Sequence, residues 1–181
     1  MTTKAPLHEW HGILSNGEHI LWQGAPDGGF HVAGKNIFGI LFGLFFAGIA
    51  MKWIIAASQA GGSFWTFGLL HFSIGIGVIV MSLFGDTYKR RHTFYTLTNR
   101  NGYVGTNLPF VGRKLKTYPI TSATPIGYAP ARFATIHFAT KEVRTKNGTR
   151  TVDVGFERIS DGAEVYSLMR SIQDTTSEHA S

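Results

Sequence analysis

Histidine is the residue of this sequence best suited to chemistry, because its imidazole binds metals and transfers protons near neutral pH. His71 lies inside a long apolar run, where an imidazole is able to ligate a haem iron or a chlorophyll magnesium. A haem in a helical bundle usually takes two histidines, and the preceding apolar run has none. We therefore expect a hydrogen bond from His71 to the partner helix, and tetrapyrrole binding is the alternative.

Three further histidines, His8, His11 and His19, lie near the N-terminus. The first two are three residues apart, a spacing that fits a weak metal site. Histidines in a polar leader more often face solvent, so we predict no metal there.

Catalytic patterns are not found in the sequence. The chain has no cysteine, which excludes disulfides, zinc–thiolate sites, iron–sulfur clusters and thiol nucleophiles. Its eleven acidic residues are scattered, and the motifs GxSxG, HExxH and GxxxxGK[ST] do not occur. We expect a protein that is not an enzyme and that has no cofactor.

The chain is basic, with a net charge of +6 at pH 7, and most of its cations follow the second apolar run. On a membrane-anchored domain such cations are able to bind anionic lipid headgroups. The equally weighted alternative is a solvated surface with determinants of membrane topology. Nucleic-acid binding is not expected, because aromatic residues do not alternate with the cations. The candidate lipid-binding residues are Lys89, Arg90, Arg91, Arg113, Lys114, Lys116, Lys141 and Arg144.

Two apolar runs, residues 37–57 and 64–84, predict a pair of transmembrane helices joined by a short turn. At about 1.5 Å per residue, each run is close to the roughly 30 Å of the hydrocarbon core. Lys35 and the cations of residues 89–91 flank the pair, which places both termini in the cytoplasm by the positive-inside rule. Residues 1–36 have no basic and apolar signal-peptide pattern, so we expect no cleaved signal. The alternative is a pair of buried helices in a soluble protein.

Small residues recur along both runs, and in a bilayer such residues let helix backbones approach closely. We expect them to pack the two helices together; the alternative is docking onto a larger membrane complex. The candidate packing residues are Gly39, Gly43 and Ala47 in the first run, and Gly68, His71, Gly75 and Ser82 in the second.

After the second run, alternating segments predict about seven short strands followed by an amphipathic helix that ends near Gln173. This order favours an all-β sandwich or barrel closed by a C-terminal helix. The expected organisation is a cytoplasmic leader at 1–36, an anchor at 37–84, a β domain at 88–173 and a disordered tail at 174–181. The start of the leader is expected to form a helix that lies at the membrane interface or, as the alternative, packs on the β domain.

Two motifs carry a resemblance to a known family. The segment TFYTLTNRNGYV, with Tyr95, Leu97, Thr98, Asn99 and Arg100, resembles the Y-x-L-T-N-R strand of bacterial pleckstrin-homology-like (PH-like) membrane proteins. The leader GEHILWQGAPD resembles the stretch that precedes the membrane helices in that family, including photosynthetic-complex assembly proteins. One position departs from the family pattern, since Asn101 replaces an arginine. The resemblance implies a PH-like fold without a settled activity.

Together these features predict a bacterial inner-membrane protein with two spans and a cytoplasmic PH-like domain. The leading hypothesis is an accessory, assembly or scaffolding partner of a larger membrane complex. The alternatives are a sensor of anionic lipid and a tetrapyrrole-binding subunit that uses His71.

Overall fold

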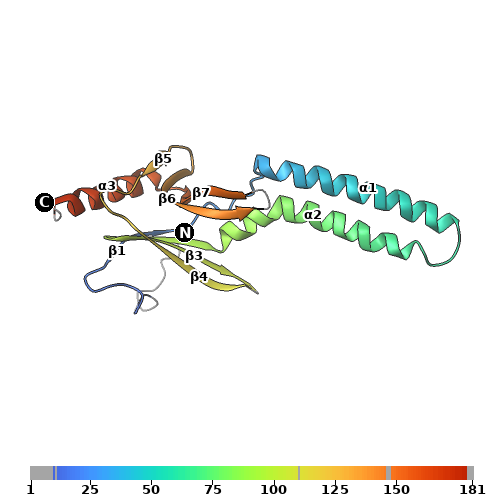
Figure 1. Cartoon of the computed structure of the whole chain (residues 1–181), viewed down its shortest axis with the longest axis horizontal. Helices are drawn as coiled ribbons and strands as arrows, with labels where there is room; N and C mark the ends of the chain where they lie inside the picture. The colour runs from blue at the N-terminus through green and yellow to red at the C-terminus, as the bar shows by residue number, and fades with distance from the viewer. Residues whose placement is uncertain (1–9, 11, 110, 146–147, 179–181) are drawn as a thin grey trace. The chain divides into compact units, whose positions relative to one another are not determined.

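The computed structural model describes residue 10 and residues 12–109, 111–145 and 148–178. The chain forms two compact units, which we describe separately (Figure 1). The helical hairpin comprises Gly28–Lys89. The β unit is built from residues up to Asp27 and from Arg90 onward.

Two long helices make up the helical hairpin: α1 at Ile37–Gln59 and α2 at Thr66–Arg91, with the 3-10 helix η2 at Gly34–Asn36 leading into α1. Both are long and apolar enough to cross a membrane, as the sequence predicted. α2 extends beyond its predicted end, so the three cations of residues 89–91 belong to its last turn instead of following it.

The first strand comes from the predicted leader. β1 at Ile20–Gly24 pairs antiparallel with β2 at Thr93–Thr98, so the helical hairpin is inserted between two neighbouring strands of one sheet. Trp22 of β1 is buried, and its ring centroid lies 5.5 Å from that of Phe156. The prediction that residues 1–36 lie outside the β domain is therefore wrong for this strand.

Most of the expected interfacial helix, including Leu7 and His11, lies outside the described residues. Trp10 is described and is buried, with its ring edge-on to that of Tyr103 at 5.4 Å. This residue therefore packs on the β unit, in agreement with the alternative to an interfacial helix.

In the described part of the chain, seven strands form two antiparallel sheets, with the orders β1-β2-β3-β4 and β5-β6-β7. The prediction of antiparallel sheets followed by a helix is confirmed. A closed barrel is not seen, because no ladder in the described part of the chain joins the two sheets. The remaining strands are β3 (Asn101–Leu108), β4 (Gly112–Pro119), β5 (Gly127–Ala129), β6 (Ala134–Thr145) and β7 (Gly148–Ile159).

The core of the β unit lies between the sheets and α3, Gly162–Glu178. The apolar residues of α3 recur every three to four positions, and the side chains of Val165, Met169 and Ile172 are buried in this core. Burial of such a side chain contributes about 1.5–3 kcal/mol. The predicted disordered tail is wrong for residues 174–178, which continue the helix; residues 179–181 are not among those described.

Candidate functional site

A buried carboxylate, that of Glu18, connects the leader to the turn between β2 and β3. Its Oε1 atom accepts hydrogen bonds from Thr98 Oγ1 at 2.6 Å, Asn101 Nδ2 at 2.8 Å and Tyr103 Oη at 3.0 Å. Its Oε2 atom accepts one from the backbone N–H of Ser15 at 2.9 Å. Four donors thus converge on a side chain that is only 8% exposed. We call this set the Glu18 network.

The same turn is also joined to the leader through Asn99. The Asn99 side chain accepts a hydrogen bond from the backbone N–H of His19 at 3.1 Å and donates one to the Gly17 carbonyl at 3.2 Å. Arg100 donates to the Asn16 carbonyl at 3.4 Å. Gly17 has φ +77°, a left-handed conformation that favours glycine. The two motif segments, distant in sequence, are therefore in direct contact.

The other two motif residues, Tyr95 and Leu97, are buried in the core. The Tyr95 hydroxyl accepts a hydrogen bond from the backbone N–H of Glu157 at 3.2 Å, and burial raises the pKa of Tyr95 to about 12. All five motif residues predicted from the sequence thus have structural contacts within the β unit.

The electrostatics of the Glu18 network favour a carboxylate that is ionised at neutral pH. Burial alone would raise the pKa of Glu18, but its hydrogen bonds from Thr98, Asn101, the Ser15 backbone and Tyr103 outweigh burial and lower it below 4.5. Burial and the Glu18 carboxylate raise the pKa of Tyr103 to about 12, so this phenol remains a donor. A carboxylate saturated with donors is suited to holding structure rather than to transferring protons.

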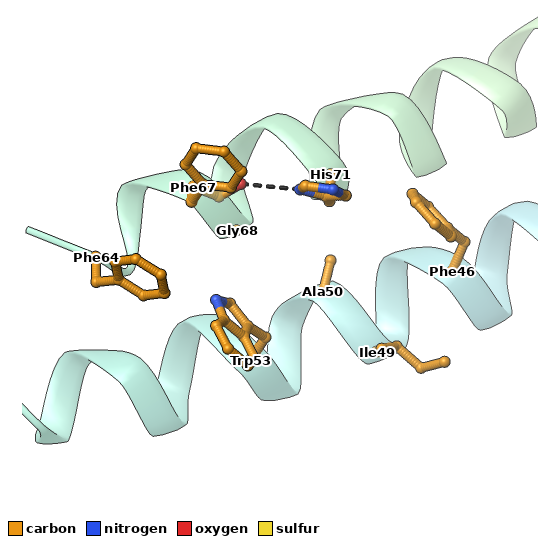
Figure 2. Close-up of a pocket in the computed structure, with 8 residues that line it drawn as sticks. All are labelled: Phe46, Ile49, Ala50, Trp53, Phe64, Phe67, Gly68 and His71. Carbon is orange, nitrogen blue, oxygen red and sulfur yellow. Dashed lines mark hydrogen bonds between the residues drawn. The ribbon is translucent and has the colours of Figure 1, made fainter.

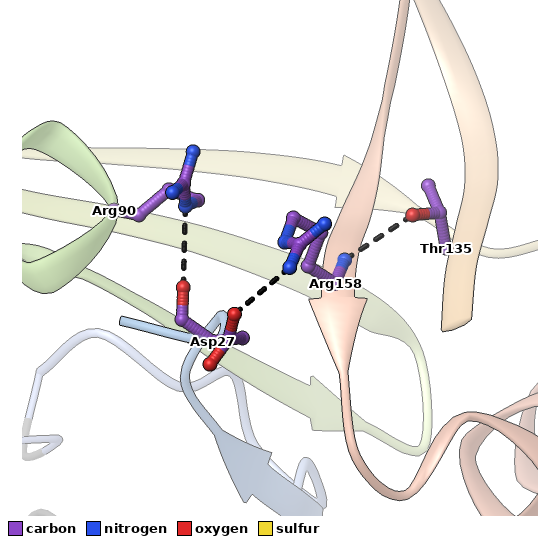
Figure 3. A network of polar contacts seen from close by, with 4 residues as sticks. All are labelled: Asp27, Arg90, Thr135 and Arg158. Atoms are coloured by element: carbon purple, nitrogen blue, oxygen red, sulfur yellow. Dashed lines mark hydrogen bonds and ion pairs between the residues drawn. The ribbon is translucent and has the colours of Figure 1, made fainter. Parts of the chain in front are cut away.

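A second polar cluster surrounds Asp27, at the end of the leader (Figure 3). Its carboxylate pairs with the Arg158 guanidinium at 2.9 Å, and its backbone carbonyl accepts a hydrogen bond from Arg90 Nε at 3.2 Å. Arg158 has φ +54°, and its backbone N–H donates to Thr135 Oγ1 at 3.2 Å. Arg90, predicted to bind lipid headgroups, therefore has a structural contact, whereas Arg158 was not singled out in the sequence.

The predicted cations of β4 are separated by face. Lys114 and Lys116 lie opposite Thr106 and Val104 of β3, and Val104 packs against the core. Directly opposite residues in an antiparallel pair share a face. Both lysines therefore belong to the core-side face, and Arg113 alternates with them onto the outer face.

The cations of the long β6–β7 ribbon can be assigned to faces in the same way, from the residues that lie opposite them. Lys141 lies opposite Val152, two positions from the buried core residue Val154. Arg150 lies opposite Val143, one step further along the same face. Lys141 and Arg150 are therefore on the core-side face of the second sheet, and both are exposed because the ribbon extends beyond the core.

The outer face of the ribbon, where it extends beyond the core, contains Arg144 together with two acidic residues. Glu142 is two positions from Arg144, and Asp153 lies opposite Thr140. In this described part of the ribbon the acidic residues thus share the face of Arg144 and not that of Lys141 and Arg150. The sequence grouped Arg144 with Lys141, but the register places them on opposite faces.

In the helical hairpin, the predicted small residues pack α1 against α2. A Cβ atom added to Gly75 would lie 2.9 Å from the Cβ of Ala47, and one added to Gly43 would lie 2.9 Å from the Gly75 carbonyl oxygen. Side chains cannot be added there without moving the helices apart. Gly39 lies against Ser82 in the same interface.

A pocket of about 330 Å³ lies between the two helices, near the turn that joins them (Figure 2). His71 lines it, and the His71 Nδ1 atom is 3.0 Å from the Phe67 carbonyl oxygen of its own helix, rather than bonded to the partner helix as predicted. The other lining residues are Phe46, Ile49, Ala50, Trp53, Phe64, Phe67 and Gly68.

Among the described residues, no group of three or more His, Cys, Asp or Glu side chains is placed to hold a metal ion. Comparisons of the chain with protein-family models, with curated proteins and with solved structures each found no match.

Proposed function

We propose that this chain is a non-catalytic accessory, assembly or scaffolding protein of a larger complex in the bacterial inner membrane. In this proposal α1 and α2 span the bilayer, both termini are cytoplasmic, and the β unit acts as a PH-like adaptor domain. The length and apolar character of both helices support the anchor, and the cations at their cytoplasmic ends support the orientation.

The observation that carries the proposal is the exposed edge of strand β4. Within the described residues β4 pairs with β3 alone, and all its residues from Gly112 to Thr117 are exposed. Leu115 is 39% exposed. An edge strand offers unpaired N–H and C=O groups to an added strand. Its cations disfavour pairing with a second copy of itself, so the expected partner is an acidic, extended segment of another membrane protein.

The test is a photo-crosslinking residue placed at Leu115 in the full chain, expressed at native level in its bacterial host. We expect it to capture a membrane protein that also copurifies in near-stoichiometric amount in mild detergent. The matched control places the same group at Thr151, an exposed position of β7. Equal capture at both positions, or copurification of phospholipid alone, would contradict a β4 docking site.

The sorting of charges by face favours a second candidate function, recognition of anionic lipid headgroups. Four cations, Lys114, Lys116, Lys141 and Arg150, occupy core-side faces, whereas Glu142 and Asp153 lie on the opposite face of the ribbon. A cation near an anionic membrane surface contributes about 1 kcal/mol. Arg144, in contrast, shares the outer face of the β6–β7 ribbon with Glu142 and Asp153.

Two double variants separate these faces with equal changes of charge. In nanodiscs that contain phosphatidylglycerol, Lys114→Glu with Lys141→Glu should lower the anionic lipid retained by the protein, measured by native mass spectrometry. Arg113→Glu with Arg144→Glu should change it little. Equal losses in both variants would indicate nonspecific charge attraction, and would count against a binding face.

A further inference from the structure

The pocket of the helical hairpin is lined mainly by aromatic side chains, together with the small residues Ala50 and Gly68 (Figure 2). Phe46 and Trp53 of α1, and Phe64 and Phe67 near the start of α2, supply its rings. Gly68 adds no side chain of its own, and the side chains of Ile54 and Trp53 pack directly over it. Because aromatic rings supply most of the lining, the pocket suits an apolar group of about the size of one ring.

Two lining side chains carry nitrogen, the Trp53 indole and the His71 imidazole, and of these two the imidazole alone is able to accept a hydrogen bond. A carbonyl oxygen only accepts hydrogen bonds, so the contact between Phe67 O and His71 Nδ1 requires the proton on Nδ1. In the neutral ring, Nε2 then keeps a free lone pair. No hydrogen bond of Nε2 is found among the described residues. The Phe46 and Phe67 ring centroids lie 6.1 and 6.0 Å from that of His71, so two aromatic rings are neighbours of the imidazole.

A hydrogen-bond acceptor beside aromatic rings favours a ligand that has an aromatic ring and a hydrogen-bond donor attached to it. In hydrocarbon, a lone pair without a donor is unfavourable, whereas a hydroxyl group on an aromatic ring would satisfy it. The volume of about 330 Å³ suits a single substituted ring. A tetrapyrrole macrocycle has four such rings and would need far more space.

We propose that this pocket binds the headgroup of a membrane-soluble quinol, whose hydroxyl donates a hydrogen bond to His71 Nε2. The isoprenoid tail would leave the pocket along the apolar outer surface of the helices. The inference rests on the membrane anchoring in the proposed function, but not on a protein partner. It concerns binding only and involves no transfer of electrons.

The experiment uses the full chain in lipid nanodiscs, with decylubiquinol under argon as the probe and native mass spectrometry as the measurement. The control ligand is the dimethyl ether of the same quinol, which has the same ring and tail but no donor. We expect the quinol to bind about tenfold more tightly than the ether, the effect of one hydrogen bond. Equal affinities would overturn the proposal.

Variants then locate the site. His71→Phe keeps an aromatic ring and should abolish the preference for quinol over ether, whereas His71→Gln keeps an acceptor and should retain part of it. Phe46→Ala should weaken binding, whereas Phe45→Ala, which changes an exposed neighbour outside the pocket, should not. Unchanged quinol binding in His71→Phe would overturn the proposal, as would a tetrapyrrole absorption band that His71→Ala removes.

An alkaline wash of isolated membranes separates this inference from the proposed function. A chain retained in the membrane that shows no quinol preference overturns the pocket proposal alone. A chain released by alkali overturns the anchor, and the pocket proposal with it.

Discussion

In the β unit, a buried carboxylate collects four hydrogen-bond donors, whereas in the helical hairpin α1 and α2 meet through residues with little or no side chain. The first arrangement depends on which polar atoms are present, and the second depends on how little space the side chains take. A buried polar network requires every donor to be paired. Helices in a bilayer gain stability chiefly from close approach. Substitutions should therefore destabilise the β unit by leaving polar groups unpaired, and the helical hairpin by forcing the helices apart.

The largest effect is expected from Glu18→Ala. It leaves the donors of Thr98, Asn101, Tyr103 and the Ser15 backbone without their acceptor in a buried site. We expect a loss of about 3 kcal/mol in the free energy of unfolding of the β unit. Urea unfolding of the full chain in detergent micelles, followed by tryptophan fluorescence, measures it. Glu142→Ala, at an exposed acid of the β6–β7 ribbon, should cost less than about 0.5 kcal/mol.

Low pH should destabilise the β unit of the wild type in the same way, by protonating the Glu18 carboxylate. The pKa of Glu18 is lower in the folded chain than its ordinary value of 4.5. The carboxylate therefore contributes its full stabilisation above about pH 4.5, and this contribution disappears as the pH falls through the folded pKa. A pH series from 7 to 3 on the wild type and on Glu18→Gln measures it. If both chains lost stability equally over this range, ionised Glu18 would not be the source.

An intermediate effect is expected from Gly75→Leu, because its side chain would meet the backbone of Ala47. Overpacking of this kind costs about 2 kcal/mol and should separate the helices. The chain has no cysteine, so a disulfide between Gly39→Cys and Ser82→Cys reports their separation. We expect a lower yield of this disulfide with Gly75→Leu.

Gly77→Leu is the matched control on the same helix. A Cβ on Gly77 would meet no atom within 4 Å, so the yield of the disulfide should not change. If Gly75→Leu and Gly77→Leu behaved alike, close helix approach would not be what holds the hairpin.

The smallest effect is expected at the partly exposed pair of Asp27 and Arg158, where Asp27→Ala should cost about 1 kcal/mol in the same urea assay. Arg158 also has a left-handed backbone that favours glycine. Arg158→Gly should therefore destabilise the wild type but be neutral or stabilising when Asp27 is already alanine. Additive losses in the double variant would indicate that the ion pair does not hold Arg158 in this conformation.

Both helices and most strands could be predicted from the sequence because their patterns are local: apolar length for α1 and α2, and alternation for β6 and β7. β1 could not, since its five residues, Ile20–Gly24, have their partner strand on the other side of the helical hairpin. No local pattern connects two such segments. The resemblance of both segments to one family was the available signal, although it did not reveal that they touch.

The sites divide in the same way. The packing glycines could be predicted because their spacing along one helix determines which face they share. Glu18 was one of eleven scattered acids in the sequence, and its burial depends on tertiary contacts. The cationic residues could be identified from the sequence, but they could not be assigned to the core-side or the outer face of a sheet. That assignment requires the register of each strand with its neighbour.

The insertion of the helical hairpin between β1 and β2 has a consequence for biogenesis. During synthesis, β1 leaves the ribosome long before β2, and pairing them across a flexible chain would require closing a long loop, residues 25–92. The antiparallel helices shorten this loop, because they bring its two ends together: Asn36 Nδ2 donates a hydrogen bond to Asp86 Oδ2 at 3.1 Å. Once η2, α1 and α2 have formed, only residues 25–33 and residue 92 of this loop lie outside the helices, apart from the turn between α1 and α2. Folding of the helices thus shortens the effective loop that must close to pair β1 with β2, which predicts that the helices form first and that the strand pair forms rapidly afterwards.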